Sequence, residues 1–468
     1  MRMNKVILYN PRSVFYTMPL ALMALGSYLD PEKYEVKILD GRIDDERTVL
    51  EACEGAICIG ITVLTGAPIY DALHITRAVK ARFPQLVVVW GGWHPSLFPE
   101  ETLKENCIDL VVNGQGEIPF ANLLDAITMG KPFDLIKGIH FRKKGVIIKT
   151  IPQPLADINS FPPINYDLIP VERYFKLKGR RQLDYISSQG CRFRCTFCAD
   201  PFMYKRGWYG LSPRRMGEEL EALWKTWHFD DVNFQDETFF TSRSRVEGIA
   251  NEILERNLKF TWFGTMRADQ GARMDDALFE LCKRSGLRKV MIGVEAGSQE
   301  MMDWMKKDIT INQVFESAEK CLRHNIAVIF NIILGFPHET RESINESLRV
   351  ARELRKMSPD FELGIFYFKP YPGNAIADQL LKEGYRFPEG LEQWAAFDYI
   401  GSSNDWISGE QYKLIEAFKF YQRIGWNRSH RVWLPVKKIA QWRCLNSRYI
   451  FPLEKRIYEL VRPPERLS

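Results

Sequence analysis

Residues 188–198 read Ser188-Gln189-Gly190-Cys191-Arg192-Phe193-Arg194-Cys195-Thr196-Phe197-Cys198, with three cysteines inside eight residues and a predicted strand, 185–188, directly before them. Spacings of four and three residues let one loop wrap one face of an iron–sulfur cube, whose standard ligands are thiolates. Three thiolates leave one iron of a four-iron cluster open to a small molecule. A structural zinc site normally takes four protein ligands, and no fourth Cys or His lies nearby. Zinc or incidental thiols remain the alternatives.

The other cysteines are scattered among apolar neighbours and are interpreted as buried thiols, which is typical of a reducing compartment. The N-terminal apolar run is too short for a signal peptide. The longest candidate membrane stretch, 326–336, is interrupted by Asn331 and too short to span a bilayer. We therefore expect a cytoplasmic protein. The six scattered cysteines are Cys53, Cys58, Cys107, Cys282, Cys321 and Cys444.

Working outward from the cysteines, strands alternate with helices over residues 181–375. This alternation predicts a partial or full (β/α) barrel, with its active site at the carboxyl ends of the strands. Helices are expected between the strands, for example over 216–227 and 244–256. The six predicted strands are 185–188, 231–235, 260–264, 289–294, 328–334 and 363–368.

Residues 1–150 alternate in the same way and predict an α/β domain, a doubly wound parallel sheet of the flavodoxin-like or Rossmann-like type. Such sheets bind ligands beyond the carboxyl ends of their strands. A proline-rich linker is expected over 151–180, and a small, mainly helical region over 376–468. The predicted N-terminal strands are 6–9, 35–39, 56–61, 86–90 and 110–112, and the clearest helices 19–29 and 69–82.

The formal net charge of +5 is unevenly placed. Residues 419–468 hold 12 Lys and Arg against three Glu, a net of +9, so the rest of the chain carries −4. Aromatic residues are interleaved with these cations, among them Trp426, Trp433, Trp442, Tyr449, Phe451 and Tyr458. The region is interpreted as a solvated helical cap, as a site for an anionic end of the substrate, or as a contact with anionic lipid at the inner membrane face. Nucleic-acid binding is the weakest interpretation, because no recognition module is present.

The cysteine spacing CxxxCxxC resembles the signature of the radical S-adenosylmethionine (SAM) superfamily over 184–375. The resemblance implies a [4Fe–4S] cluster held by Cys191, Cys195 and Cys198, with SAM at the open iron. Short polar or aromatic motifs at the strand ends match the superfamily's SAM contacts, although an acidic residue at a strand end is more often a helix cap when taken alone. The SAM-binding residues implied in this way are Phe197, Asp236, Glu237, Thr238, Arg267 and Glu295.

The N-terminal domain resembles cobalamin-binding domains, in which an S/TxL segment and a GG pair line a slot for the nucleotide tail. Here Thr62-Val63-Leu64 and Gly91-Gly92 occupy these positions, with 26 residues between Leu64 and Gly91. Residues 10–15 lack the histidine that ligates cobalt in some relatives, so the lower face of the cobalt is expected to be open or covered near Leu64. A generic flavodoxin-like fold remains the alternative. The implied cobalamin-binding residues are Thr62, Leu64, Gly91, Gly92 and Gly114.

The order of the two domains resembles the cobalamin-dependent radical SAM enzymes. This resemblance implies hydrogen abstraction by a 5′-deoxyadenosyl radical, then methyl transfer from methylcobalamin to an unactivated carbon. An oxidative cyclase or rearrangement enzyme of the anaerobic Mg-protoporphyrin ester cyclase type is one alternative, and a non-catalytic cobalamin sensor or carrier is another. The implied partners are a small-molecule substrate and a reductant such as flavodoxin or ferredoxin. No residue is assigned to catalysis beyond cofactor binding.

Overall fold

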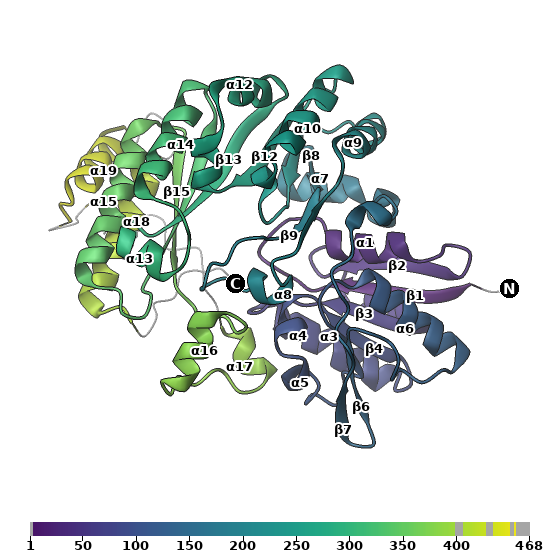
Figure 1. Cartoon of the computed structure of the whole chain (residues 1–468). Helices are drawn as coiled ribbons and strands as arrows, with labels where there is room; N and C mark the ends of the chain where they lie inside the picture. Colours follow the sequence, from purple (N-terminus) through teal and green to yellow (C-terminus); the bar gives the residue numbers. More distant parts are fainter. Residues whose placement is uncertain (1–2, 398–405, 427–433, 450–453, 455–468) are drawn as a thin grey trace. The chain divides into compact units, whose positions relative to one another are not determined.

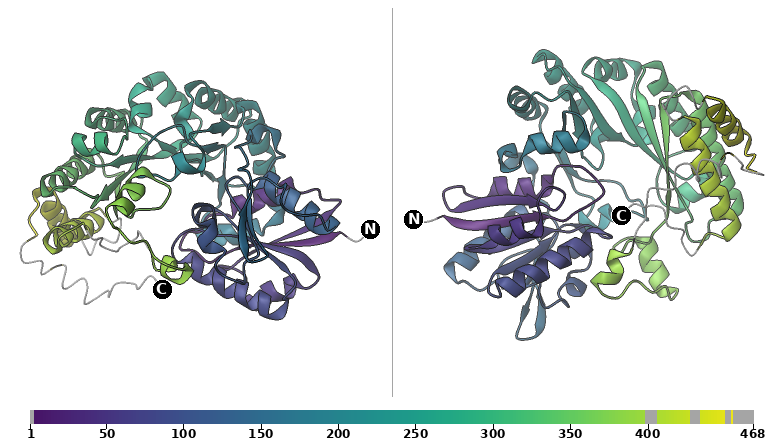
Figure 2. Two further views of the ribbon diagram at one scale, coloured as in Figure 1. Left: turned by 60° about the horizontal axis from the view of Figure 1, so that its bottom comes forward. Right: turned by 180° about the vertical axis from the view of Figure 1, so that it is seen from behind.

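The computed structural model describes residues 3–397, 406–426, 434–449 and 454. The chain divides into two compact units, coloured along the sequence in Figures 1 and 2. In the part of the chain that is described, no helix is long and apolar enough to cross a membrane. Unit 1 contains 1–265, 284–287 and 370–398, and unit 2 contains 266–283, 288–369 and 399–468.

Unit 1 is built on a seven-stranded sheet in the order β2-β1-β3-β4-β5-β6-β7. The first five strands pair in parallel, as predicted, and their buried Val, Ile and Leu side chains form the core. The last two strands form an antiparallel hairpin that was not predicted from the sequence. The strands are β1 (Asn4–Asn10), β2 (Tyr34–Asp40), β3 (Ala56–Thr62), β4 (Val87–Gly91), β5 (Leu110–Val112), β6 (Ile139–Lys143) and β7 (Val146–Lys149).

Helices cover both faces of this sheet, which makes it doubly wound (Figure 1). Helices α1 and α6 pack against each other on one face, and α2 and α3 pack against each other on the other. Because the chain moves outward in both directions from β1 and β3, the carboxyl ends of these strands open a crevice, where such folds bind ligands. The helices are α1 (Leu20–Tyr28), α2 (Glu46–Cys53), α3 (Pro68–Arg82), α4 (Trp93–Leu97), α5 (Pro99–Thr102) and α6 (Glu117–Met129).

The linker after this sheet is extended and carries two short 3₁₀ turns, η1 (Ile158–Ser160) and η2 (Tyr166–Leu168). Its last part is helical: α7 (Val171–Lys178) begins directly after Pro170 and ends before Gly179, which has φ +64°. The irregular part is therefore shorter than the predicted span of 151–180.

Three strands that the sequence assigns to the barrel follow in unit 1, and they pair in parallel. The first of these strands lies three residues earlier in the chain than predicted. The structure has β8 (Gln182–Tyr185) and then a separate strand, β9 (Ser188–Gly190), which pairs antiparallel with β10 (Trp208–Gly210). The cysteine loop thus begins from this small sheet and not directly from a barrel strand. The remaining elements are β11 (Asp231–Phe234), β12 (Thr261–Met266), α8 (Asp200–Met203), η3 (Phe239–Thr241), α9 (Pro213–Trp227) and α10 (Arg243–Glu255).

Unit 2 holds the other three predicted barrel strands, again parallel, with alternating burial along β14 and β15. All six predicted strands are therefore present. Its elements are α11 (Ala268–Arg273), α12 (Asp276–Arg284), β13 (Leu287–Glu295), α13 (Gln299–Trp304), α14 (Ile311–Arg323), β14 (Ala327–Leu334), α15 (Arg341–Met357), β15 (Phe361–Tyr367), α18 (Gly409–Gly425) and α19 (Leu434–Asn446).

After β15 the chain returns to unit 1 as α16 (Ala375–Lys382) and α17 (Leu391–Ala395). The ring of Trp394 lies 4.3 Å from that of Phe98 and 5.7 Å from that of His94, and its side chain is buried. The compact units therefore do not follow the predicted domain boundary between residues 375 and 376, because aromatic packing ties α17 to the N-terminal sheet.

Candidate cofactor sites

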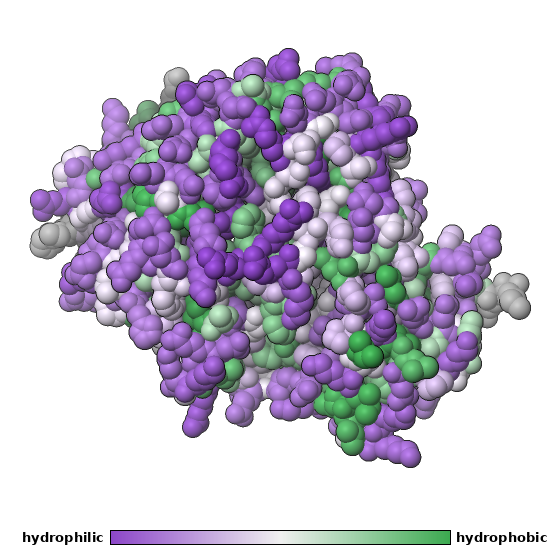
Figure 3. Space-filling model, in the orientation of Figure 1, coloured by the Kyte–Doolittle hydropathy of each residue, from purple (hydrophilic) through white to green (hydrophobic). Residues whose placement is uncertain are grey.

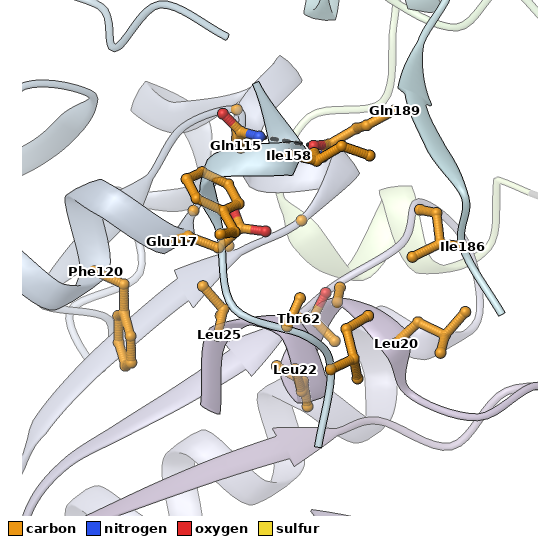
Figure 4. Close-up of a pocket in the computed structure, with 18 of the residues that line it drawn as sticks. Leu20, Leu22, Leu25, Thr62, Gln115, Glu117, Phe120, Ile158, Ile186 and Gln189 are labelled. Carbon is orange, nitrogen blue, oxygen red and sulfur yellow. Dashed lines mark hydrogen bonds between the residues drawn. The ribbon is translucent and has the colours of Figure 1, made fainter. Parts of the chain in front are cut away.

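A cavity of about 340 Å³ lies in unit 1 beyond the carboxyl ends of the parallel strands β3, β4 and β5 (Figure 4). Its walls are mainly aliphatic and come from α1, the strand ends and α6, with part of the linker on one side. Polar groups lie at only a few points. The residues labelled in Figure 4 are Leu20, Leu22, Leu25, Thr62, Gln115, Glu117, Phe120, Ile158, Ile186 and Gln189.

The segments that follow β3 and β4 are hydrogen-bonded to each other. The amide of Val63 donates to the carbonyl of Gly91 at 2.8 Å, and the amide of His94 donates to the carbonyl of Val63 at 3.0 Å. Gly92 has φ +89°, and a Cβ on it would lie 2.7 Å from Thr62 Oγ1. Only glycine fits this close approach without strain. The spacing noticed in the sequence therefore corresponds to a single backbone cradle.

Four of the five predicted cobalamin-binding residues line the cavity: Thr62, Gly91, Gly92 and Gly114. Leu64 does not line it, and its side chain is 43% exposed. A slot for a planar base needs close backbone approach and apolar walls, and both are present here, so the residues fit cobalamin. The binding roles of the individual residues stay predictions.

His94 is fully buried beside this cradle and does not line the cavity. Its Nδ1 lies 3.2 Å from Thr65 Oγ1, and its Nε2 meets no hydrogen-bond partner among the described residues. Burial lowers the pKa of His94 to about 3. The imidazole is therefore neutral at physiological pH and packs as an aromatic side chain against Phe98 and Trp394.

A carboxyl group from the loop after β11 also reaches the cavity. The hydroxyl of Tyr204 donates to Glu237 Oε1 at 2.8 Å, while Glu237 Oε2 is buried and has no partner in the described chain. Burial, followed by the nearby charge of Asp200, raises the pKa of Glu237 to about 8. Burial also raises the pKa of Glu117, which lines the same cavity. Glu237 is therefore mainly protonated at neutral pH and can donate a hydrogen bond.

Asp236 has a structural role in addition to the SAM contact that its position in the motif implied. Its carboxylate accepts hydrogen bonds from Ser187 N at 2.7 Å, Ser187 Oγ at 2.6 Å and Ser188 Oγ at 2.6 Å. It thereby fastens the start of β9, the strand that leads into the cysteine loop. Its predicted contact with SAM stays untested beside this structural role.

Arg245 completes the same network and is a residue that no sequence motif indicated. Its Nη2 donates to both Ser187 O and Ser187 Oγ at 2.7 Å, and its Nε donates to Leu211 O at 2.9 Å. The guanidinium is buried and lies over the rings of Trp208 and Phe239. Burial lowers the pKa of Arg245. A single arginine in a helix gives no sequence signal of such a role.

The cysteine loop carries its three thiols without any disulfide. Burial raises the pKa of Cys191 to about 11 and that of Cys198 well above its usual value, and the charge of Asp200, followed by those of the neighbouring thiols, adds to both shifts. Within the described ranges, no three His, Cys, Asp or Glu side chains are gathered as metal ligands. The fit to an iron–sulfur cluster thus depends on the chemistry of the three thiols and not on a preformed ligand geometry. Iron would offset the burial that disfavours thiolates here.

The other predicted SAM residues divide between the units. In unit 1, the carbonyl of Phe197 accepts a hydrogen bond from Asn374 at 3.0 Å, and Thr238 is buried. In unit 2, Arg267 donates to the carbonyl of Lys307 at 2.5 Å. Glu295, at φ +66°, binds Lys307 Nζ at 2.6 Å. Lys307 therefore joins both predicted residues of unit 2, and no motif had indicated it.

Comparison with known proteins now gives the family. A model of the Radical SAM superfamily matches residues 185–351, and a model of the B12 binding domain matches residues 9–124. The chain is a cobalamin-dependent radical SAM enzyme. This assignment brings a [4Fe–4S] cluster, SAM and cobalamin as its cofactors, as the resemblance had implied.

Several relatives of this radical SAM enzyme match over most of their length. It is 28% identical to an uncharacterized methyltransferase of Pyrococcus horikoshii, over 86% of this chain and 88% of that one. It is 24% identical to the anaerobic magnesium-protoporphyrin IX monomethyl ester cyclase of Synechocystis sp., over 96% of this chain and 84% of that one. The solved structure of OxsB, a cobalamin-dependent SAM radical enzyme, shares the fold with a TM-score of 0.76 at 17% identity, over 98% of this chain and 73% of that one.

Proposed function

We propose that this radical SAM enzyme transfers a methyl group from cobalamin to a carbon atom of a small-molecule substrate. The observation that carries the proposal is the cavity of unit 1, which the glycine cradle after β4 and Glu237 after β11 both line. The predicted cobalamin-binding residues and the end of a radical SAM strand thus line one cavity. This arrangement suits a reaction in which both cofactors act on one substrate. When bound, the cluster with SAM supplies radical chemistry, and cobalamin supplies the methyl group.

The chain's own residues position these groups. Cys191, Cys195 and Cys198 would hold the cluster, and Asp236 with Arg245 fixes the strand that leads into their loop. Thr62, Gly91, Gly92 and Gly114 would hold cobalamin. The predicted SAM contacts are Phe197, Glu237, Thr238, Arg267 and Glu295, with Asp236 as a sixth.

The cavity itself controls water and protons. Its aliphatic walls exclude water, which would otherwise quench a reactive intermediate. Glu237 keeps a proton at neutral pH and shares a hydrogen bond with Tyr204, so it can donate to a carbonyl or amide of a bound group. Leu64, outside the cavity, offers an apolar side chain and no cobalt ligand.

Reconstitution under anaerobic conditions tests this proposal. The wild-type protein is expected to show the absorption and electron paramagnetic resonance signals of a [4Fe–4S] cluster and to cleave SAM. The C191A/C195A/C198A variant is expected to lose both. A cluster that persists in that variant, or a wild-type protein that binds cobalamin without forming 5′-deoxyadenosine, would contradict the proposal and favour a cobalamin sensor or carrier.

Product mass separates methylation from the cyclase alternative, which the relative from Synechocystis sp. keeps open. We expect a substrate found by comparing metabolite extracts before and after reaction to gain one methylene unit in mass. With SAM labelled at its methyl group, the label should appear in the product. A product that loses hydrogen and gains no carbon would assign the enzyme to the cyclases.

A surface of unit 2 supports contact with anionic lipid, as one interpretation of the basic C-terminal region had suggested. Helix α19 buries Ala440 and Cys444 but exposes Leu434, Ile439 and Trp442, the last to 57%. At 3.6 residues per turn these three lie on one side of the helix. No acidic residue occurs in α19, whereas Lys437 and Lys438 do. Residues 427–433 and, apart from Glu454, 450–468 lie outside the described residues.

Sedimentation with phosphatidylglycerol-containing vesicles tests this surface. We expect binding at low salt, less binding at high salt, and loss of binding in I439E/W442E. The L381E variant, which changes an exposed leucine of α16, is the control and should bind as wild type does. Equal sedimentation of I439E/W442E and wild type would exclude the surface.

A further inference from the structure

Four cations surround the cysteine loop on its solvent side. Arg192 and Arg194 stand between the cysteines, and Lys205 and Arg206 follow α8, which comes directly after the loop. All four side chains belong to exposed residues. In Figure 3 the most hydrophilic colour gathers over the middle of this face, where β9 and α8 lie in Figure 1.

Contacts bring Arg192, Lys205 and Arg206 together, and Arg194 lies two residues from Arg192 in the exposed part of the loop. Arg206 Nε donates to the carbonyl of Arg192 at 3.1 Å, so the two segments adjoin. Lys205 Nζ lies 4.2 Å from the ring centre of Phe202, which is itself 42% exposed. The guanidinium of Arg192 lies 4.8 Å from the ring centre of Trp208. Among the residues that the structure describes, Arg192, Lys205 and Arg206 form no ion pair with a carboxylate, so their charges are available to a partner.

The backbone that presents two of these cations is unusual. Lys205 has φ +49° and Arg206 has φ +61°, two successive non-glycine residues in the left-handed region. A non-glycine residue in this region is strained, and the conformation persists only where the surrounding structure imposes it. The turn thus holds two long cationic side chains at the rim of the cysteine loop. A glycine would satisfy the backbone but would present no charge.

We propose that Arg192, Arg194, Lys205 and Arg206, together with Phe202, form the docking surface for an acidic one-electron carrier protein. The proposal rests on the proposed function, because the cluster must receive one electron before SAM is cleaved. In this step the carrier loses one electron, the cluster gains it, and no bond is formed or broken. Opposite charges steer such short-lived encounters, which use small interfaces. The patch is compact and lies where the thiols do, and this favours a carrier over an extended polyanion.

Stopped-flow reduction of the reconstituted holoenzyme by a reduced, strongly acidic flavodoxin tests the surface. We expect K205E/R206E to lower the second-order rate of cluster reduction about tenfold at low salt, and to weaken its dependence on salt. The control K144E/K149E changes two exposed lysines of the β6–β7 hairpin by the same charge and should react as wild type does. With dithionite, a small reductant that needs no docking surface, both variants should be reduced and should cleave SAM at the wild-type rate.

Equal rates for K205E/R206E and wild type with flavodoxin would overturn the proposal, as would an equal loss in the control. Tighter binding of a single-stranded oligonucleotide than of flavodoxin at the same salt would assign the surface to nucleic acid. If K205E/R206E incorporates less iron than wild type, the milder K205Q/R206Q should still show about a threefold loss with flavodoxin. A wild-type protein that does not cleave SAM with dithionite would refute the proposed function, and that outcome is separate from docking.

Discussion

Single residues near the cysteine loop carry the most strongly constrained chemistry. Asp236 and Arg245 do not pair directly; both bind Ser187, one through its amide and hydroxyl and the other through its carbonyl and hydroxyl. If Ser187 and Leu211 moved away, the buried charge of Arg245 would lose its carbonyl acceptors. A buried charge without partners is strongly destabilising. The pair therefore fixes β9 more firmly than its three residues of pairing alone would.

Arg245→Gln tests this positioning role. Because the variant removes the charge and two of the hydrogen bonds that hold β9, we expect the free energy of unfolding to fall by about 3 kcal/mol. Amide hydrogen exchange over 187–190 should become faster in the protein without its cluster. The control is Arg243→Gln, an exposed position on the same helix. Unchanged exchange at these amides would refute the role, whatever happens to overall stability.

The cradle at Gly92 gives a second prediction at this scale. In Gly92→Ala the new Cβ meets Thr62 Oγ1 at 2.7 Å and Val63 N at 2.9 Å, at a φ that alanine rarely adopts. We expect cobalamin affinity, measured by spectral titration, to fall about tenfold or more, and stability to fall by about 2 kcal/mol. Gly114→Ala has a similar φ of +79°, but its Cβ meets nothing within 4 Å. It should lose only the smaller, conformational part, and equal effects in the two variants would contradict the steric argument.

At the scale of elements, the strands of the regular strand–helix alternation could be predicted from the sequence. Strands that depend on a single tertiary contact or turn were missed. The five parallel strands of the seven-stranded sheet follow from continuous β-branched runs, and β5 was predicted at its observed bounds, 110–112. The β6–β7 hairpin was missed because its only local signal is Lys144-Gly145, both at positive φ. Strand β9 was merged with β8 because its pairing depends on the close approach of Gly190 to the carbonyl of Gly207.

The same contrast separates the residues of the candidate site that could be predicted from those that could not. Thr62, Gly91 and Gly92 were found because two spaced motifs mark strand ends. The hydrogen bond from Tyr204 to Glu237 could not be predicted, because it joins residues 33 positions apart in the sequence. Lys307 and Arg245 resemble ordinary solvent-facing cations in the sequence, since burial is decided by tertiary packing.

Helix α17 gives the prediction that belongs to this scale. Trp394 contacts Phe98, Phe397 and His94, and Glu392 pairs with Arg77 of α3 at 2.5 Å. Trp394→Ala should therefore destabilise unit 1 by about 3–5 kcal/mol. It should also expose 370–398 to limited proteolysis. Leu381→Ala, at an exposed position of α16, is the control and should leave the cleavage pattern unchanged. Resistance of Trp394→Ala to protease would show that α17 is held by other contacts.

At the scale of the whole molecule, each unit buries a titratable group with an opposite pH response. In unit 1, burial lowers the pKa of His94 to about 3, so the unfolded chain binds more protons as the pH falls below 6.5. In unit 2, burial raises the pKa of Glu339 to about 7, despite hydrogen bonds from the amides of Gly335 and Phe336. The native state therefore keeps a proton that the unfolded chain loses above pH 4.5.

Thermal unfolding as a function of pH tests both groups. The contribution of His94 should be present above pH 6.5 and lost as the pH falls toward 3, and that of Glu339 should be present below pH 4.5 and lost as the pH rises through 7. Each slope is at most about 1.4 kcal/mol per pH unit. His94→Gln should flatten the acidic arm, and Glu339→Gln the other. Parallel curves for a variant and wild type would show that the residue does not titrate in that range.

The return of residues 370–398 to unit 1 also sets an order of assembly during synthesis. A ribosome releases the sheet of unit 1 first and then most of unit 2, and only afterwards does Trp394 emerge to cover His94 and Phe98. Nascent domains fold largely as they appear. For most of the time in which the rest of the chain is translated, the N-terminal sheet therefore lacks the packing of Trp394. Truncated translation products that stop before residue 390 will expose the surface formed by His94 and Phe98.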